Sequence, residues 1–180
     1  MTIRRPFVHY KNRYLFETGS HNGDGIQDAL DAGFEEIHSY EVFPQWHNHC
    51  IERFKANPNV HLHFKSSVNM WEEIVQINEP ITFWLDGHYS GTNNETGYDP
   101  HNFYPLLKEL QEIGRHSIKN HTICIDDRRL LIQTNEQTPH SIGFSEEIII
   151  NLLKEINSNY TIIYKDGVCP NDVIIAYIKE

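Results

Sequence analysis

The sequence predicts an α/β fold with a mostly parallel sheet of about seven strands and an antiparallel hairpin at the C-terminal end. Apolar runs of strand length alternate with helical patterns along the whole chain. The last two runs are separated by a segment too short for a helix, with Asp166-Gly167 and Cys169-Pro170, so these strands should be antiparallel. Acidic residues close several runs, where an open parallel sheet places its ligand crevice.

The first unit is a strand, a glycine-rich loop and a helix. A short apolar run ends in an acid, Glu17, and the helical pattern that follows the loop ends at Gly33. This arrangement brings backbone N–H groups and a helix N-terminus close to a bound small molecule. Glycine is needed where a side chain would block the ligand or where φ is positive. The loop glycines are Gly19, Gly23 and Gly25.

The remaining elements follow in the same alternation. Further strands are expected over residues 36–42, 60–65, 81–85, 121–125, 160–164 and 172–178. Helices are expected from Pro44 to Asn57-Pro58, after Ser66-Ser67, from Tyr104 to Gly114, and from Glu146 onwards. The buried faces of these helices should include Ile51, Val75 and Ile148. A polar loop over residues 87–102 is longer than compact domains usually keep without a use, and we expect it to contact the substrate.

Length, charge and cysteine content restrict the class of protein. The 180 residues suit a single domain over residues 1–180, in which residues 1–12 form a solvated N-terminal arm. No apolar run approaches the roughly 20 residues of a membrane span, so a membrane partner is not expected. Three cysteines without a C-x-x-C pair favour a reducing, cytoplasmic setting. The net charge of −10 makes nucleic acid an unfavourable partner. A homodimer would help to close the site of so small a domain.

The succession of motifs resembles a class I S-adenosylmethionine-dependent methyltransferase over nearly the whole chain. The first motif of that family, an acid followed by a glycine loop, matches Glu17-Thr-Gly-Ser-His-Asn-Gly23, although His21 and Asn22 replace smaller residues. The second, an acid that ends the next strand, matches Glu41. The resemblance implies a three-layer Rossmann-like methyltransferase sandwich and S-adenosylmethionine as cofactor, with Glu41 on the ribose hydroxyls. The implied cofactor-binding residues are Glu17, Thr18, Gly19, Ser20, Gly23, Glu41, Val42, Ser67 and Asp86.

A narrower resemblance lies in Phe83-Trp-Leu-Asp-Gly-His88 and Ile125-Asp-Asp-Arg128. These segments are similar to the macrocin-type and cephalosporin-type metal-dependent O-methyltransferases. Three carboxylates at one strand edge would repel one another unless a hard cation or hydrogen bonds compensate. The resemblance also implies that Asp86 and His88 are catalytic, with His88 as general base. The implied Mg²⁺ ligands are Asp86, Asp126 and Asp127.

Three functions remain open at this level. The resemblance favours transfer of a methyl group to a hydroxyl of a small-molecule or sugar acceptor, with or without Mg²⁺. A non-catalytic cofactor- or nucleotide-binding Rossmann-like module would keep the loop and transfer nothing. A metal-dependent hydrolase or sugar-nucleotide enzyme would use only the cluster of Asp86, Asp126 and Asp127. Arg128 and Arg129 offer a simpler role for these acids, because they could pair with them without any metal.

Overall fold

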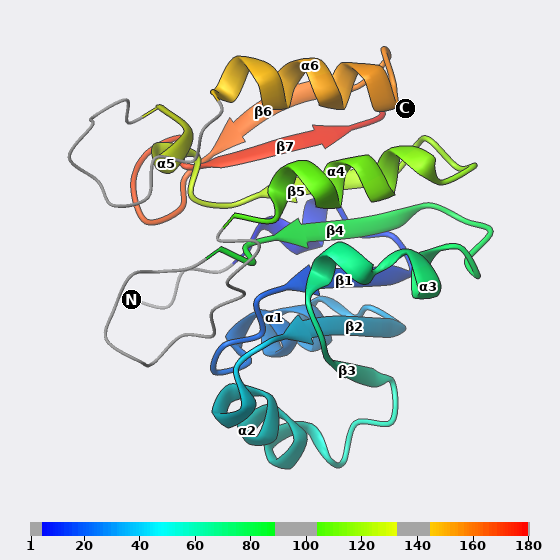
Figure 1. Ribbon diagram of the computed structural model, residues 1–180, viewed down its shortest axis with the longest axis vertical. Helices are drawn as coiled ribbons and strands as arrows, with labels where there is room; N and C mark the ends of the chain where they lie inside the picture. Colours follow the sequence, from blue (N-terminus) through cyan, green and yellow to red (C-terminus); the bar gives the residue numbers. More distant parts are fainter. Residues whose placement is uncertain (1–4, 89–103, 133–144, 180) are drawn as a thin grey trace.

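Seven strands form one mixed sheet in the computed structural model, which describes residues 5–88, 104–132 and 145–179 (Figure 1). The strands are β1 (Tyr14–Thr18), β2 (Glu36–Glu41), β3 (Val60–Phe64), β4 (Ile81–Leu85), β5 (Thr122–Ile125), β6 (Thr161–Lys165) and β7 (Val173–Tyr177). Their order across the sheet is β3-β2-β1-β4-β5-β7-β6. Strand β7 runs antiparallel to both β5 and β6, which confirms the predicted C-terminal hairpin.

The strand order reverses between β1 and β4. Strand β1 pairs in parallel with β2 on one side and with β4 on the other, and Thr18 is in register with Tyr40 and Leu85. The carboxyl ends of these three strands therefore meet at one edge of the sheet. In open α/β sheets this reversal is where a ligand crevice forms.

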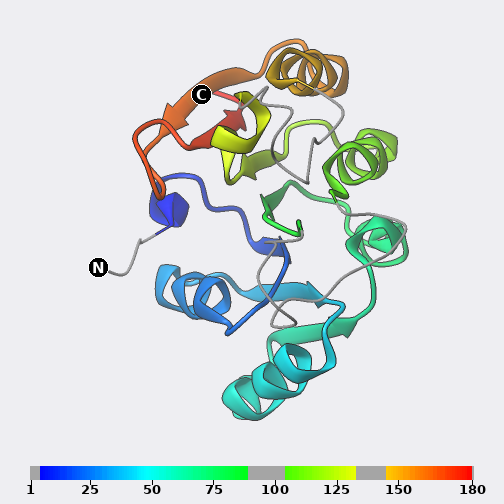
Figure 2. The same ribbon diagram turned by 60° about the vertical axis from the view of Figure 1, so that its left-hand side comes forward.

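Helices cover both faces of the sheet and give three layers (Figure 2). One face carries α1 (Asp24–Ala32) and α2 (Pro44–Phe54), and the other carries α3 (Trp71–Ile74), α4 (Leu106–Arg115) and α6 (Glu146–Ile156). A short helix, α5 (Arg128–Ile132), and two 3₁₀ turns, η1 (Pro6–His9) and η2 (Ser67–Asn69), complete the described elements. The predicted three-layer sandwich is confirmed.

Strand β4 shows how the two cores share one sheet. Every residue of β4 is buried, as the continuous apolar run predicted. Because successive side chains point to opposite faces, Phe83 packs with the helices α4 and α6, while Trp84 packs with α1 and α2. The sheet is therefore covered on both sides where the site lies.

The N-terminal segment is docked, and the prediction of a solvated arm over residues 1–12 was wrong for its described part. Phe7 is buried, with its ring 5.5 Å from the rings of both Phe34 and Trp84. Arg5 lies over the face of Trp84 and pairs with Asp28 at 3.2 Å. An aromatic side chain in a basic segment supplies the apolar area that holds the segment in place.

Three predicted core residues are instead exposed, because the buried stripe of each helix lies one position away. Neighbouring residues take the core positions: Cys50, Ile74 and Ile149 are buried. The exposed residues are Ile51, Val75 and Ile148.

Two predicted boundaries also differ. Helix α4 continues to Arg115 instead of ending at Gly114, and helix α5 forms between β5 and α6, where no helix was predicted. Most of the predicted substrate loop over residues 87–102 lies outside the described residues. None of the described helices has the length and apolar character needed to cross a bilayer.

Candidate functional site

The loop after β1 is packed directly against the end of β4. Gly19 has φ of 82°, a left-handed conformation that favours glycine. Its N–H group donates a hydrogen bond of 2.9 Å to the carbonyl of Tyr40, at the end of β2. A Cβ atom on Gly19 would lie 2.6 Å from the carbonyl oxygen of Asp86, so a larger residue does not fit. Gly19 thus allows the ends of β1, β2 and β4 to meet.

Glu17 lies beneath this loop, on the side of the sheet that carries α1. The Ser39 hydroxyl donates to Oε2 of Glu17 at 2.6 Å, whereas its Oε1 is buried with no hydrogen-bond partner among the described residues. Burial raises the pKa of Glu17 to about 7, although the Arg5 guanidinium and the Ser39 hydroxyl oppose the shift. The Glu17 side chain is therefore packed beneath the loop and is not exposed to a ligand.

Glu41 is held at the end of β2 by backbone groups. Its Oε2 accepts a hydrogen bond of 2.9 Å from the N–H of His21, in the glycine loop. Its Oε1 accepts hydrogen bonds from Val42 and Phe43, at 2.9 and 2.8 Å. The carboxylate therefore has a fixed orientation, and each of its oxygens can accept more than one hydrogen bond.

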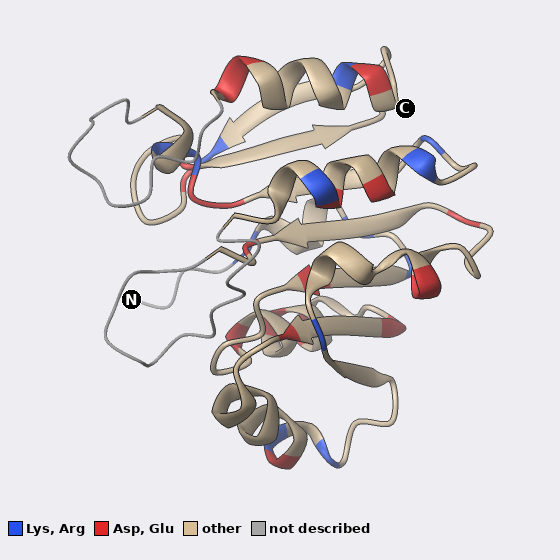
Figure 3. Ribbon diagram, in the orientation of Figure 1, with Lys and Arg blue, Asp and Glu red and all other residues tan. Residues whose placement is uncertain are grey.

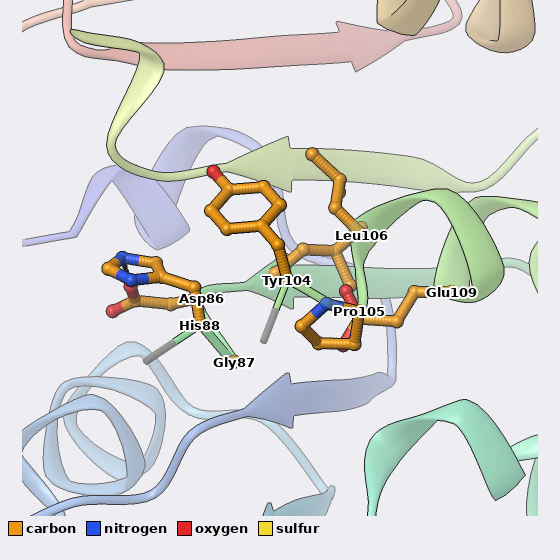
Figure 4. A pocket seen from close by; sticks show the side chains of 8 residues that line it. Asp86, Gly87, His88, Tyr104, Pro105, Leu106 and Glu109 are labelled. Atoms are coloured by element: carbon orange, nitrogen blue, oxygen red, sulfur yellow. Dashed lines mark ion pairs between the residues drawn. The ribbon is translucent and has the colours of Figure 1, made fainter. Parts of the chain in front are cut away.

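A second group of residues lies at the ends of β4 and β5, where the ribbon of Figure 3 carries acidic positions, and Figure 4 shows the side chains of Asp86 and His88. The Nε2 atom of His88 lies 2.6 Å from Oδ2 of Asp127 and 3.7 Å from Oδ1 of Asp86. The ring of Tyr104 stacks on His88, with centroids 5.4 Å apart. Asp127 has φ of 57°, a conformation that few residues other than glycine adopt. Strained backbone of this kind occurs often at functional sites.

The carboxyl groups in this second group have unequal affinities for protons. Burial and the neighbouring Asp126 raise the pKa of Asp86 to about 8, although His88 opposes the shift. Burial and Asp127 raise the pKa of Asp126 to about 6. The pKa of Asp127 is lowered despite its burial, because His88 and Arg129 stabilise its charged form. Such a separation between neighbouring acids is common where one group holds a proton and another holds a charge.

Arg129 already compensates part of this negative charge. Its guanidinium pairs with Asp127 at 2.5 Å and also with Asp172, which is buried. Arg128 pairs with Glu146 instead, so only one of the two arginines has the alternative role considered from the sequence. Two overlapping sets of side chains have ligand atoms close enough for one cation: Asp86, His88 and Asp127, and Asp126, Asp127 and Asp172. Asp127 belongs to both sets, and its carboxylate already interacts with Arg129 and His88. Neither set is therefore arranged as a preformed Mg²⁺ site.

A small pocket that is open to solvent lies beside Asp86 and His88 (Figure 4). Its wall includes Tyr104 and Glu109, which is buried near the start of α4. The sequence interpretation missed Glu109, although its position three residues after Leu106, on the apolar face of the helix, was a signal. A charged residue on a buried stripe requires a partner or a function. Glu17 and Glu41 do not line this pocket; they lie in the adjoining group around Gly19.

The two groups are joined by hydrogen bonds between the other predicted residues. The N–H of Asp86 donates to the Thr18 hydroxyl at 3.0 Å, and the Ser20 hydroxyl lies 2.6 Å from that of Ser39. Ser67 donates to Glu109 at 2.5 Å. The predicted cofactor residues thus lie around neighbouring strand ends. Both predicted catalytic residues, Asp86 and His88, follow β4, and Asp126 and Asp127 follow β5.

The strand order, the C-terminal hairpin and the glycine loop at the reversal define the Rossmann-like fold of class I methyltransferases. Solved structures with this fold include a proposed rRNA methylase from Clostridium thermocellum, with 12% identity over 95% of this chain and 92% of that chain, and a TM-score of 0.63. A proposed methyltransferase from Streptococcus mutans in complex with SAH also has a TM-score of 0.63, with 14% identity over 98% and 99% of the two chains. An rRNA methylase from Streptococcus thermophilus covers 100% of both chains, with 14% identity and a TM-score of 0.58. No family model and no curated protein matches the sequence.

Proposed function

We propose that this chain is an S-adenosylmethionine-dependent methyltransferase that acts on a hydroxyl group of a small molecule or sugar. The observation that carries the proposal is the contact of Gly19 with the Asp86 carbonyl at the reversal of strand order, next to the fixed carboxylate of Glu41. The solved structures with the same fold, one of them with bound SAH, support it.

The residues around Gly19 fit an adenosyl cofactor. Gly19 and Gly23 have left-handed backbone conformations, and their lack of side chains lets the loop pack closely on the Asp86 carbonyl and the Phe54 ring, at the strand ends where a cofactor would bind. Glu41 accepts three hydrogen bonds from the backbone, so its carboxylate keeps one acceptor site, on Oε2, for a ribose hydroxyl. Ser67 and Val42 lie at the neighbouring strand ends, where the adenine would be expected. When bound, the cofactor supplies an electrophilic methyl group on a sulfonium.

Asp86 and His88 are the proposed acid–base residues. Both line the pocket, and an acceptor hydroxyl must lose a proton when it takes a methyl group. If His88 takes that proton, its positive charge lies beside the carboxylate of Asp127, with Nε2 at 2.6 Å from Asp127 and at 3.7 Å from the carboxyl group of Asp86. A positioned base of this kind contributes on the order of 10² to 10⁴ in rate.

The charges around the pocket favour a neutral or cationic acceptor over a phosphorylated one. The sequence contains no lysine or arginine from residue 66 to residue 107, a range that includes nearly the whole pocket wall. The arginines near the same edge of the sheet are already paired, Arg5 with Asp28 and Arg129 with Asp127. Binding of RNA requires cations that contact phosphates. We therefore propose a small acceptor, although two of the structural neighbours are described as rRNA methylases.

The proposal includes no step through Mg²⁺, because the carboxylate of Asp127 is already bound by Arg129 and His88. Metal dependence remains a prediction of the narrower resemblance. A cytoplasmic location also remains a prediction, as does a homodimer. All three cysteines of the chain are free thiols, which agrees with a reducing compartment.

Calorimetry with SAH tests the proposal, with two glycine variants as a matched pair. Gly19→Ala places a Cβ 2.6 Å from the Asp86 carbonyl oxygen and should abolish binding. Gly33→Ala has the same left-handed strain, with φ of 77°, but its Cβ would lie 3.5 Å from the nearest atom, and it should bind like the wild type. Absence of wild-type binding at millimolar SAH would refute the proposal. Binding without methyl transfer to a panel of hydroxyl and amine acceptors would instead favour the non-catalytic module.

A further inference from the structure

Glu109 is a buried acid that joins both groups of the candidate site. It lies in α4, 1% exposed, and its side chain lines the pocket beside Asp86 and His88 (Figure 4). Its Oε1 accepts a hydrogen bond of 2.5 Å from the Ser67 hydroxyl. No lysine or arginine pairs with it among the described residues.

The contacts of Glu109 extend to the loop that carries Gly19. The Thr18 hydroxyl also favours the charged form of Glu109 and lowers its pKa, and it accepts the N–H of Asp86 at 3.0 Å. The backbone of Gly87 packs on this pair: a Cβ there would lie 3.0 Å from the Thr18 hydroxyl and 3.2 Å from Oε1 of Glu109. One carboxyl group thus contacts η2, the end of β1 and the end of β4.

We propose that Glu109 is a positioning residue that holds the cofactor loop and the acceptor pocket in one geometry, through the hydroxyls of Ser67 and Thr18. The proposal rests on the proposed function, because it assigns Glu109 a role in binding the adenosyl ligand. A charged carboxylate accepts from both hydroxyls at once, whereas a protonated carboxyl must donate its own hydrogen and lose one of these contacts. The charged form therefore defines the binding geometry.

Other titratable groups face the same pocket and must be separated from Glu109 in any test. Asp86 and His88 line the wall, and Tyr104 lies close enough that Glu109 contributes to its raised pKa. Burial raises the pKa of Glu109 itself to about 7, against the opposing effect of the two hydroxyls and of His88. Its charge therefore changes near neutral pH, where SAH affinity can be measured on both sides.

The test compares the affinity for SAH at pH 6 and pH 8 in the wild type and two variants. If only the charged form binds well, Glu109 should tighten wild-type binding about tenfold between these pH values, because the competent fraction rises from about a tenth to about nine tenths. Glu109→Gln keeps the shape of the side chain but cannot titrate. The ratio of its SAH affinity at pH 8 to that at pH 6 should therefore be about tenfold smaller than the same ratio in the wild type. Glu112→Gln is the matched control, since Glu112 lies on the same helix and pairs with Arg115. It should keep the wild-type ratio.

The possible outcomes separate the inference from the proposed function. Equal ratios in the wild type and Glu109→Gln would overturn the positioning role, even if the variant bound SAH more weakly at every pH. Absence of SAH binding by the wild type would overturn the proposed function, and the inference with it. If Glu109→Gln does not fold, Ser67→Ala replaces it, because it removes the hydrogen bond that stabilises the charged form of Glu109 and should move the pH at which SAH binding tightens upward. An unchanged pH profile in Ser67→Ala would overturn the inference.

Discussion

Protonation of His121 should couple the stability of this fold to pH. His121 is buried and its Nδ1 accepts the N–H of Ile81 at 3.0 Å, so its proton must be on Nε2. That nitrogen lies 3.1 Å from Nδ1 of His116, whose Nε2 lies 2.9 Å from the carbonyl of Ile77. The two neutral rings therefore form a chain of hydrogen bonds that fixes both ends of the turn before β4. A second proton on His121 would break the chain at Ile81.

The size of the effect follows from the pKa of His121 in the two states. Burial and the neighbouring His116 lower its pKa in the folded protein from 6.5 to about 3. Between these values the unfolded chain binds a proton that the folded chain excludes, so stability is lost as the pH falls below 6.5. From about pH 7.5 to about pH 5.5 this loss amounts to roughly 1.4 kcal/mol. Most of it comes from protonation of the unfolded state, so the result does not depend on the depth of the folded-state pKa.

Urea unfolding of the wild type and of His121→Gln at these two pH values measures the effect. Glutamine can accept from Ile81 and donate to His116, but it does not titrate. Glu17 and Glu109, whose pKa values are raised to about 7, contribute a pH dependence of opposite sign, and they are present in both proteins. The stability that the wild type loses between the two pH values should exceed the loss of the variant by about 1.4 kcal/mol. Losses that agree within about 0.5 kcal/mol would refute the assignment.

Two further predictions concern the packing of the N-terminal segment and the ion pairs of Arg129. Phe7→Ala should destabilise the protein by about 3 kcal/mol in urea unfolding, because the ring is buried against Phe34 and Trp84. A loss of stability below about 0.5 kcal/mol would instead support the prediction of a solvated N-terminal arm. Arg129→Met should cost about 2 kcal/mol, less than a fully buried pair, because it leaves Asp127 and Asp172 without their cation. Millimolar Mg²⁺ should then raise the melting temperature of the variant but not of the wild type, and a wild-type increase would instead support a resident metal.

The parts of the site that could be predicted are those that depend on short stretches of sequence. Glu17, Glu41 and Asp86 each end an apolar run, and parallel strands bring such ends to one edge. Gly19 and Gly23 were informative for a similar local reason, since a left-handed φ restricts the residue type where the chain turns, whereas Gly25 lies inside α1. Element order was sufficient to place both signals at the reversal between β1 and β4.

The parts that could not be predicted depend on contacts between distant residues. Glu109 lies 42 positions from its partner Ser67, and Arg129 lies 43 positions from Asp172. Nothing in the local pattern around Arg5 shows that its segment packs on Trp84. The rotational position of a helix is similarly underdetermined, because adjacent apolar residues such as Cys50 and Ile51 differ in burial only through the packing of α2 on the sheet.

The same helix explains how a glycine loop with two large residues keeps its shape. His21 and Asn22 depart from the small residues of the family motif, and His21 has φ of 44°. One stripe of α2 holds both residues from outside the loop: the Trp46 ring lies 4.2 Å from that of His21, and the Cys50 thiol donates to the carbonyl of His21 at 3.3 Å. Arg53 donates to the carbonyl of Asn22 at 2.5 Å. These three helix residues are four and three positions apart and therefore share one face. Helix α2 thus holds the His21 ring and the backbone carbonyls of both residues, while the Asn22 side chain exchanges hydrogen bonds with Asp24 at the start of α1, so the loop keeps its shape with these larger residues.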